Sequence, residues 1–344
     1  MLIVLLMSEA RSPGNATARA VLSRVGSWGD EKMGRWLITL TVIVLTIAAV
    51  LAVNSIFVDL ETRPAMARSG GSLMETDIVT ANVKVEGDGP PVVLIHGFGA
   101  ALDWWDEITP QLSGGHKVIR LDLIGHGGTA APGSGYAIER QAALVKEVLD
   151  KLGVARAVVI GHSMGGEVAT AFTVAHPESV ERLVLIDSPP KPETNFDLMT
   201  RLGLTRLIGQ GLWRLRTDSA MRRALSQGFA PGFPVPEKFV ADLWQLTYTV
   251  FKHAHEDTIA YVAEEGTPAR LSKLDPVPQL LVIFGTEDAL IAPSSAKLFE
   301  QVPGEKVVMI DGAGHSPMVE KPQETLAAIL DFLAAAAPGS ALAE

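Results

Sequence analysis

Residues 157–175 read AVVIGHSMGGEVATAFTVA. This stretch begins with four apolar residues, as a strand buried on both faces would, and ends in a small and apolar run that predicts a helix. Between them lies Gly161-His162-Ser163-Met164-Gly165, which matches the pattern G-x-S-x-G in a strand–turn–helix setting. So tight a turn requires residues without side chains two before and two after the serine. It lifts the Ser163 hydroxyl clear of the sheet, above a helix N-terminus that favours negative charge.

Similar apolar runs recur along the chain and predict further buried strands. They are Pro91–Ile95, Val118–Leu121, Leu183–Ile186, Leu280–Phe284 and Val307–Ile310. The segment Asp77–Val85 instead alternates at period 2 in its second half, which predicts a half-exposed antiparallel strand. Helices are expected between the strands, for example at Ile138–Leu152 and Thr325–Ala335. This alternation predicts an α/β fold with a mostly parallel central sheet flanked by helices.

Composition divides the chain into four expected segments. Residues 1–35 are expected to be disordered, 36–57 to form an apolar helix, 58–74 to be a linker, and 75–338 to form the globular domain. Within that domain, Pro189 to Leu274 breaks the strand–helix alternation for about eighty residues and carries many large side chains. An insertion of that size predicts a helical cap at about 190–274.

The segment Trp36–Val53 has 18 residues without a charge or a proline. A membrane-spanning helix needs roughly 17–25 such residues and a signal-peptide core about 7–15, which favours an uncleaved anchor. A cleaved signal and a buried core helix remain the alternatives. Lysine and arginine are more frequent before the segment (Arg19, Arg24, Lys32, Arg35) than after it (Arg63, Arg68). We therefore expect a membrane-anchored protein with its catalytic domain on the non-cytoplasmic side, or an exported one if the signal is cleaved.

Charge and cysteine content exclude several classes of function. The formal net charge of −10 over 344 residues argues against a nucleic-acid partner, which would need a basic face. The chain has no cysteine. That excludes disulfides, thiol nucleophiles and cysteine-ligated metals together.

Two further motifs carry a family resemblance. His96-Gly97-Phe98-Gly99 follows one buried strand, and the stretch from Asp122 to Thr129 (DLIGHGGT) follows the next. Together with the turn around Ser163, they make the chain from about residue 75 resemble the α/β-hydrolase fold family, of the AB hydrolase-1 type. The resemblance implies a serine hydrolase acting on a carbonyl carbon, with no metal or organic cofactor.

A serine hydroxyl needs a base, and the base needs an orienting acid. His315, in the loop after the strand Val307–Ile310, lies where the family keeps its base. Asp288, after the strand Leu280–Phe284, is the expected acid, which gives the family's chain order of nucleophile, acid and base. Asp187 competes for that role because a minority of the family places the acid after the earlier strand. Glu287 is adjacent to Asp288 but should point the other way.

The oxyanion hole is expected from two backbone N–H groups, those of Met164 and Phe98. The Phe98 ring is expected to line the acyl pocket. Trp104 and Trp105 are candidates for substrate contact, although packing of the first helix explains at least one of them equally well.

The function expected is hydrolysis of a hydrophobic carboxylic ester through an acyl-enzyme. One alternative is a carbon–carbon bond hydrolase of ring-cleavage dienoates, which uses the same triad and needs a cation for its substrate's carboxylate. The cap arginines available for this role are Arg201, Arg206, Arg214, Arg216, Arg222 and Arg223. The other alternative is a non-catalytic, membrane-tethered binding protein with this fold.

Overall fold

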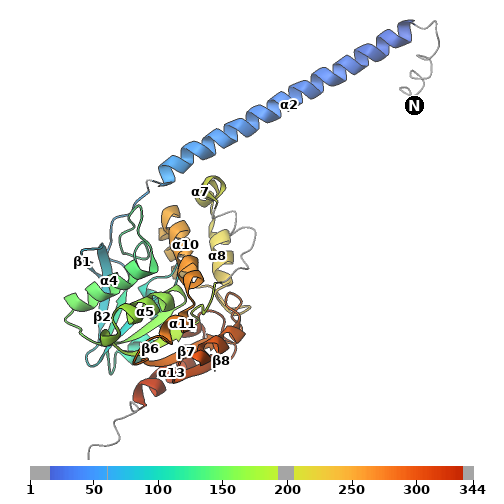
Figure 1. The fold of residues 1–344 in the computed structure, drawn as a ribbon. Coiled ribbons are helices and arrows are strands. Elements are labelled where there is room, and N and C mark those ends of the chain that lie inside the picture. Colours follow the sequence, from blue (N-terminus) through green and yellow to red (C-terminus); the bar gives the residue numbers. More distant parts are fainter. Residues whose placement is uncertain (1–15, 60, 193–204, 336–344) are drawn as a thin grey trace, which may run out of the picture. The chain divides into compact units, whose positions relative to one another are not determined.

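The computed structural model describes residues 16–59, 61–192 and 205–335 (Figure 1). They fall into two compact units, Met1–Ile56 and Phe57–Glu344, and each is considered by itself.

The first unit consists of helix α2, Ala16–Asp59. Its part Met33–Phe57 is long and apolar enough to span a membrane, with a mean hydropathy of 2.7. None of that apolar window is buried, which argues against the buried core helix considered above. The hydroxyls of Thr39, Thr41 and Thr46 donate to carbonyl oxygens one turn earlier, at 2.8–2.9 Å, so each is satisfied without water.

Helix α2 begins twenty residues before the apolar segment, where a lack of regular structure is expected from sequence. Residues 16–35 are helical, and residues 1–15 of that expected segment lie outside the described residues. The reason is cooperativity: once the apolar segment has formed a helix, adding residues to its end avoids the cost of a new nucleus.

The second unit is built on an eight-stranded sheet with the order β1-β2-β4-β3-β5-β6-β7-β8. The strands are β1 Ser72–Glu75, β2 Thr80–Glu86, β3 Pro91–Ile95, β4 Lys117–Leu121, β5 Ala157–His162, β6 Val180–Ile186, β7 Gln279–Gly285 and β8 Glu305–Ile310. Strand β2 pairs antiparallel with both β1 and β4. Every other pair, from β4–β3 to β7–β8, is parallel. The predicted α/β fold with a mostly parallel sheet is confirmed.

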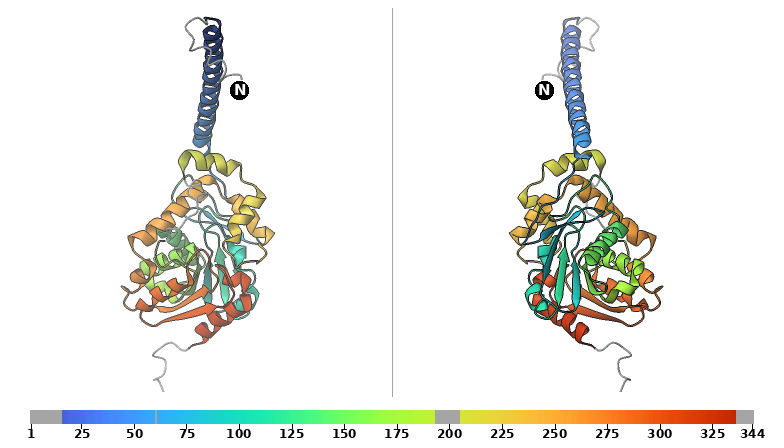
Figure 2. Two further views of the ribbon diagram at one scale, coloured as in Figure 1. Left: turned by 90° about the vertical axis from the view of Figure 1, so that its right-hand side faces the viewer. Right: turned by 90° about the vertical axis from the view of Figure 1, so that its left-hand side faces the viewer.

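Helices cover both faces of this sheet (Figure 2). Helices α4 (Ile138–Lys151) and α5 (Met164–Ala175) belong to one hydrophobic cluster, and α13 (Pro322–Ala334) belongs to the other. Strand β3 contributes side chains to both clusters: Val93 and Ile95 belong to the first, and Val92 and Leu94 belong to the second. Burial on both faces is why the strand is an unbroken apolar run.

The described part of the insertion between β6 and β7 is helical, as expected for a cap. Its helices are α7 Arg206–Arg214, α8 Asp218–Ser226, α9 Glu237–Gln245, α10 Tyr248–Glu264 and α11 Thr267–Leu271. Residues 193–204 of the expected cap lie outside the described residues. The shorter elements elsewhere are η1 Leu102–Trp105, α3 Thr109–Leu112, η2 Pro177–Ser179, η3 Pro293–Gln301 and α12 Pro317–Glu320.

The segment expected as a linker lies along the domain. The backbone N–H of Arg63 donates to the Ala131 carbonyl at 2.9 Å, and that of Met66 donates to the Gly128 carbonyl at 2.8 Å. The last part of the segment, from Ser72, forms edge strand β1. Contacts with the loop after β4 therefore begin within a few residues of the end of α2.

Candidate active site

The turn between β5 and α5 holds Ser163 in an uncommon backbone conformation, with φ of +53° and ψ of −124°. A side chain at Gly165 would collide with the Ile95 and His96 carbonyl oxygens, and one at Gly161 would collide with the Gly165 carbonyl. The Ser163 N–H donates to the Ile186 carbonyl of β6 at 2.9 Å. Glycine at 165 therefore lets the turn approach the end of β3 this closely, and glycine at 161 lets the turn close on itself.

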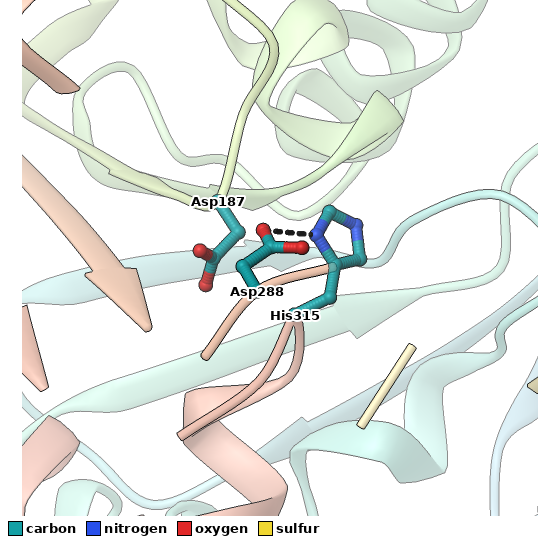
Figure 3. Close-up of side chains that lie close together, drawn as sticks. All are labelled: Asp187, Asp288 and His315. Atoms are coloured by element: carbon teal, nitrogen blue, oxygen red, sulfur yellow. Dashed lines mark hydrogen bonds and ion pairs between the residues drawn. The ribbon is translucent and has the colours of Figure 1, made fainter. Parts of the chain in front are cut away.

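Three residues from distant parts of the chain meet at this turn. The Oγ of Ser163 lies 2.9 Å from His315 Nε2, and His315 Nδ1 lies 2.8 Å from Asp288 Oδ2. Asp288 and His315 are each only 6% exposed. Figure 3 shows the Asp288 carboxylate facing the imidazole ring. Such a chain of contacts can move a proton from a serine hydroxyl to an imidazole.

The Asp288 carboxylate is ionised despite its burial. Burial alone would raise its pKa, but the adjacent His315 imidazole and the N–H groups of Ile291 and Leu290 lower it overall. Those N–H groups donate to Oδ1 at 3.0 and 2.8 Å. The other oxygen, Oδ2, faces His315, so each carboxylate oxygen has a partner.

Asp187, the competing acid, is also present at this site. Single ligand atoms of Asp187, Asp288 and His315 lie within 4.8 Å of one another, close enough to hold a metal ion. Both ring nitrogens of His315 already have partners, however: Asp288 on one side and Ser163 on the other. The hydrogen-bond geometry favours an acid–base chain through His315, with Asp288 and not Asp187 next to the ring.

Three other histidines surround the site and are neutral at pH 7. Burial lowers the pKa of His96 to about 4 and, together with a neighbouring histidine, the pKa of His126 and His162 to about 3. His96 Nε2 accepts from the Leu123 N–H at 3.0 Å, and His162 Nε2 lies 2.7 Å from the His315 carbonyl oxygen. These ring nitrogens thus contact backbone groups of neighbouring loops, as expected for histidines within motifs that shape the backbone.

Phe98 lies where the cap meets the sheet. Its ring centroid is 5.9 Å from that of Phe251 and 5.8 Å from that of His255, both on α10. Met164, the other expected oxyanion donor, is the first residue of α5. A side chain at Gly97 would come within 3.0 Å of the Ser163 Cβ, so the loop after β3 lies directly against the turn that precedes α5.

The two tryptophans differ from one another. Trp105 is fully buried among the apolar residues of the α13 side of the sheet, a position that favours packing over substrate contact. Trp104 is 5% exposed, stacks on Phe239 of the cap with ring centroids 4.0 Å apart, and donates from Nε1 to Asp242 at 3.2 Å. Trp104 therefore joins the sheet to cap helix α9.

Sequence reasoning missed Glu320, the last residue of α12. Its carboxylate accepts from the N–H groups of Gly314 and Ser316, both at 3.1 Å, which flank His315. It also accepts from the N–H of Ala230 in the cap at 2.7 Å. One carboxylate thus fixes the histidine loop and ties it to the cap, and the nearby sequence carries no motif that signals this.

The chain is similar to proteins of known class. The sequence model of the family described as alpha/beta hydrolase fold matches residues 90–322. A 2-hydroxy-6-oxo-6-(2'-aminophenyl)hexa-2,4-dienoic acid hydrolase from Metapseudomonas resinovorans is 27% identical, over 72% of this chain and 85% of that protein. Lipase 1 from Psychrobacter immobilis is 26% identical, over 78% and 82%. The crystal structure of a membrane phospholipase A matches with a TM-score of 0.64 at 24% identity, over 92% of this chain and 97% of that one, and shows a shared fold.

Replacing Glu320 by alanine should lower the free energy of unfolding by about 2–3 kcal/mol, because three backbone N–H groups lose a charged acceptor. The matched control is Glu300→Ala, which removes an exposed glutamate from η3 and should change stability by less than about 0.5 kcal/mol. Urea unfolding of the detergent-solubilised chain measures both. Equal midpoints for the two variants would contradict the role given to Glu320.

Proposed function

Because the chain belongs to the α/β-hydrolase fold family, we propose that it is a serine hydrolase that cleaves hydrophobic carboxylic esters through an acyl-enzyme. The observation that carries the proposal is the continuous chain Ser163–His315–Asp288, with contacts of 2.9 and 2.8 Å. A relative named as a lipase, 26% identical over most of both chains, supports the ester class.

In the proposed mechanism, Ser163 Oγ attacks the ester carbonyl carbon while His315 Nε2 takes its proton. The alcohol leaves with that proton, and an acyl group remains on Ser163. His315 then activates a water that hydrolyses the acyl-enzyme. Asp288 holds the tautomer with the proton on Nδ1 and stabilises the imidazolium that forms in each half-reaction.

The oxyanion would be held by the N–H groups of Met164 and Phe98. Met164 begins α5, so the partial positive charge of the helix N-terminus adds to its donor. A single such donor is typically worth ~3–4 kcal/mol of barrier. Since both donors belong to the backbone, the side chains are free for other roles, and Phe98 can face an acyl chain.

The apolar substrate class rests on the cap. Beyond Phe98, the α10 residue Phe251 packs on Trp213 of α7 with ring centroids 4.7 Å apart. This aromatic cluster of Phe98, Phe251 and Trp213 joins the loop after β3 to the cap. An acyl chain extending from Ser163 toward it would lose contact with water, which favours longer chains.

A carbon–carbon bond hydrolase is the second candidate, favoured by the relative that hydrolyses a hexadienoic acid. That reaction needs a cation for the carboxylate. Among the described cap arginines, Arg216 lies between the rings of Trp213 and Trp244, and Arg222 pairs with Glu237 at 2.6 Å. Both already have partners, Arg214 and Arg223 are exposed, and Arg201 lies outside the described residues, so the ester function has the better support.

Helix α2 would anchor the enzyme in a membrane. The excess of lysine and arginine before the apolar segment favours a cytoplasmic N-terminus, with the catalytic domain on the other side. Hydrophobic esters concentrate in lipid, which gives a tethered esterase access to its substrate. A cleaved signal, and with it an exported enzyme, is the alternative.

The first prediction from the proposed function concerns the triad. Ser163→Ala should abolish ester turnover and fluorophosphonate labelling, and Asp288→Asn should lower kcat by about 10⁴-fold because it holds the wrong imidazole tautomer. Ser294→Ala and Asp88→Asn, both at exposed positions, are the matched controls and should behave as wild type. Labelling that persists without Ser163 would remove it from the proposal. An unlabelled wild type that binds ligands without turnover would indicate the non-catalytic alternative.

The second prediction concerns acyl chain length. From aryl acetate to octanoate, kcat/KM should rise by up to ~0.8 kcal/mol per methylene, about fourfold each, if the aromatic cluster receives the chain. A flat profile, or a preference for acetate, would show that the cap aromatics only pack on one another. Faster turnover of a ring-cleavage dienoate than of any ester would favour the second candidate.

The third prediction concerns topology. In spheroplasts of expressing cells, added protease should digest the catalytic domain while the membrane is intact. Digestion only after lysis would reverse the orientation. A domain recovered in the soluble cytoplasmic fraction would show that the helix neither anchors nor exports it, and mass spectrometry of the mature N-terminus separates the anchor from a cleaved signal.

A further inference from the structure

Asp187 occupies a constrained position directly after β6. It is fully buried, and its φ of +42° is uncommon for any residue other than glycine, although aspartate and asparagine tolerate it. Its backbone N–H donates to the Ile283 carbonyl of β7 at 2.9 Å, and its Oδ1 accepts from the Gly285 N–H at 3.0 Å. One bond therefore fixes the backbone of Asp187 and the other fixes its side chain, next to the Asp288 carboxylate (Figure 3).

The other oxygen of Asp187, Oδ2, is buried and has no hydrogen-bond donor among the described residues. An ionised Asp187 carboxylate would be destabilising here, because its buried oxygen would lose its hydration without gaining a hydrogen bond. The same oxygen carrying a proton becomes a donor. One oxygen of Asp187 and one of Asp288 lie within 4.8 Å of one another, and Asp288 is the side-chain hydrogen-bonding neighbour that can accept. Two buried carboxyl groups at such close range share one negative charge.

The surroundings decide which of the two keeps the charge. Asp288 faces the His315 imidazole and accepts from two backbone N–H groups. The titratable groups that act on Asp187 are Asp288 and Glu320, with His315 close by and His162 behind that ring. No lysine or arginine is among them in the described part of the chain. Burial and the Asp288 charge raise the pKa of Asp187 well above its usual range.

We propose that Asp187 is a positioning residue whose protonated carboxyl donates a hydrogen bond from Oδ2 to the Asp288 carboxylate. The bond would hold Asp288 in the orientation that faces His315 Nδ1 and would stabilise the charge that the imidazolium needs. Asp187 touches no substrate in this scheme. The inference rests on the proposed function, because it assigns Asp187 to the same triad.

Two substitutions separate the effect of the hydrogen-bond donor at position 187 from the effect of the positive φ there. Asp187→Asn keeps the shape, tolerates the positive φ and always carries an N–H donor. Asp187→Gly relieves the positive φ but removes the donor. With an aryl hexanoate as the probe and the full-length protein in detergent, the Asn variant should keep kcat within about threefold. The Gly variant should lose about 10- to 30-fold in kcat, with KM changed less than twofold.

A pH profile tests whether Asp187 is neutral. A protonated His315 could not take the Ser163 proton, so the second-order rate of fluorophosphonate labelling of Ser163 should fall at low pH. Replacing a neutral acid by a neutral amide should leave that acid limb in place, within about 0.3 pH unit. If Asp187 were ionised in the wild type, Asp187→Asn would remove a negative charge that stabilises the His315 imidazolium. The acid limb of the labelling profile would then move to lower pH by about one to two pH units.

The outcomes distinguish this inference from the proposed function. If Ser163 in the wild-type protein is neither labelled nor able to turn over esters, the proposed function fails. If the wild type is active, the positioning role is overturned by an Asn variant as impaired as the Gly variant, by a Gly variant with wild-type kcat, or by a shifted acid limb in Asp187→Asn. Thermal unfolding of each variant is the control: should Asp187→Gly fail to fold, the Asn rate and its acid limb still decide.

Discussion

The rest of the site depends on one steric constraint, the close approach of the turn at Ser163 to the end of strand β3. The turn fits only because Gly161 and Gly165 carry no side chains toward neighbouring carbonyl oxygens. Its N–H bond to Ile186 fixes it against β6 on the other side. The backbone therefore fixes the direction of the Ser163 Cα–Cβ bond, and the strained φ is maintained by two strands. His315 Nε2, 2.9 Å from Oγ, is the partner of the hydroxyl itself.

Burial and hydrogen bonding then decide which titratable groups around the Ser163 hydroxyl are charged and which are neutral. The surrounding histidines His96, His126 and His162 are neutral because a charged ring would lose its hydration. Asp288 stays charged because it has His315 and two N–H donors. His315 thus remains as the base next to the hydroxyl, with no cation among the motif histidines.

The cap is held by contacts of two kinds. Aromatic stacking joins Trp104 to Phe239, and polar bonds join Lys238 to Asp106 at 2.9 Å and Glu320 to the cap backbone. The residues that hold the cap are thus close to those that shape the site. Substitutions at these contacts should also change stability, because the same side chains pack the cap against the rest of the domain.

The strands β3 to β8 and the three loops that carry Ser163, Asp288 and His315 were predictable from the amino-acid sequence, since two-sided burial forces continuous apolar runs and glycine spacing marks the turn. Neither β1, a four-residue exposed edge strand without periodicity, nor the helix over residues 16–35 was predictable in this way. The contact of Asp288 with His315 and the contacts of Glu320 and Asp187 became visible only in the folded structure. Those contacts depend on the parallel register of β6 with β7 and on loops far apart in the chain, and a one-dimensional pattern carries no information on such distances.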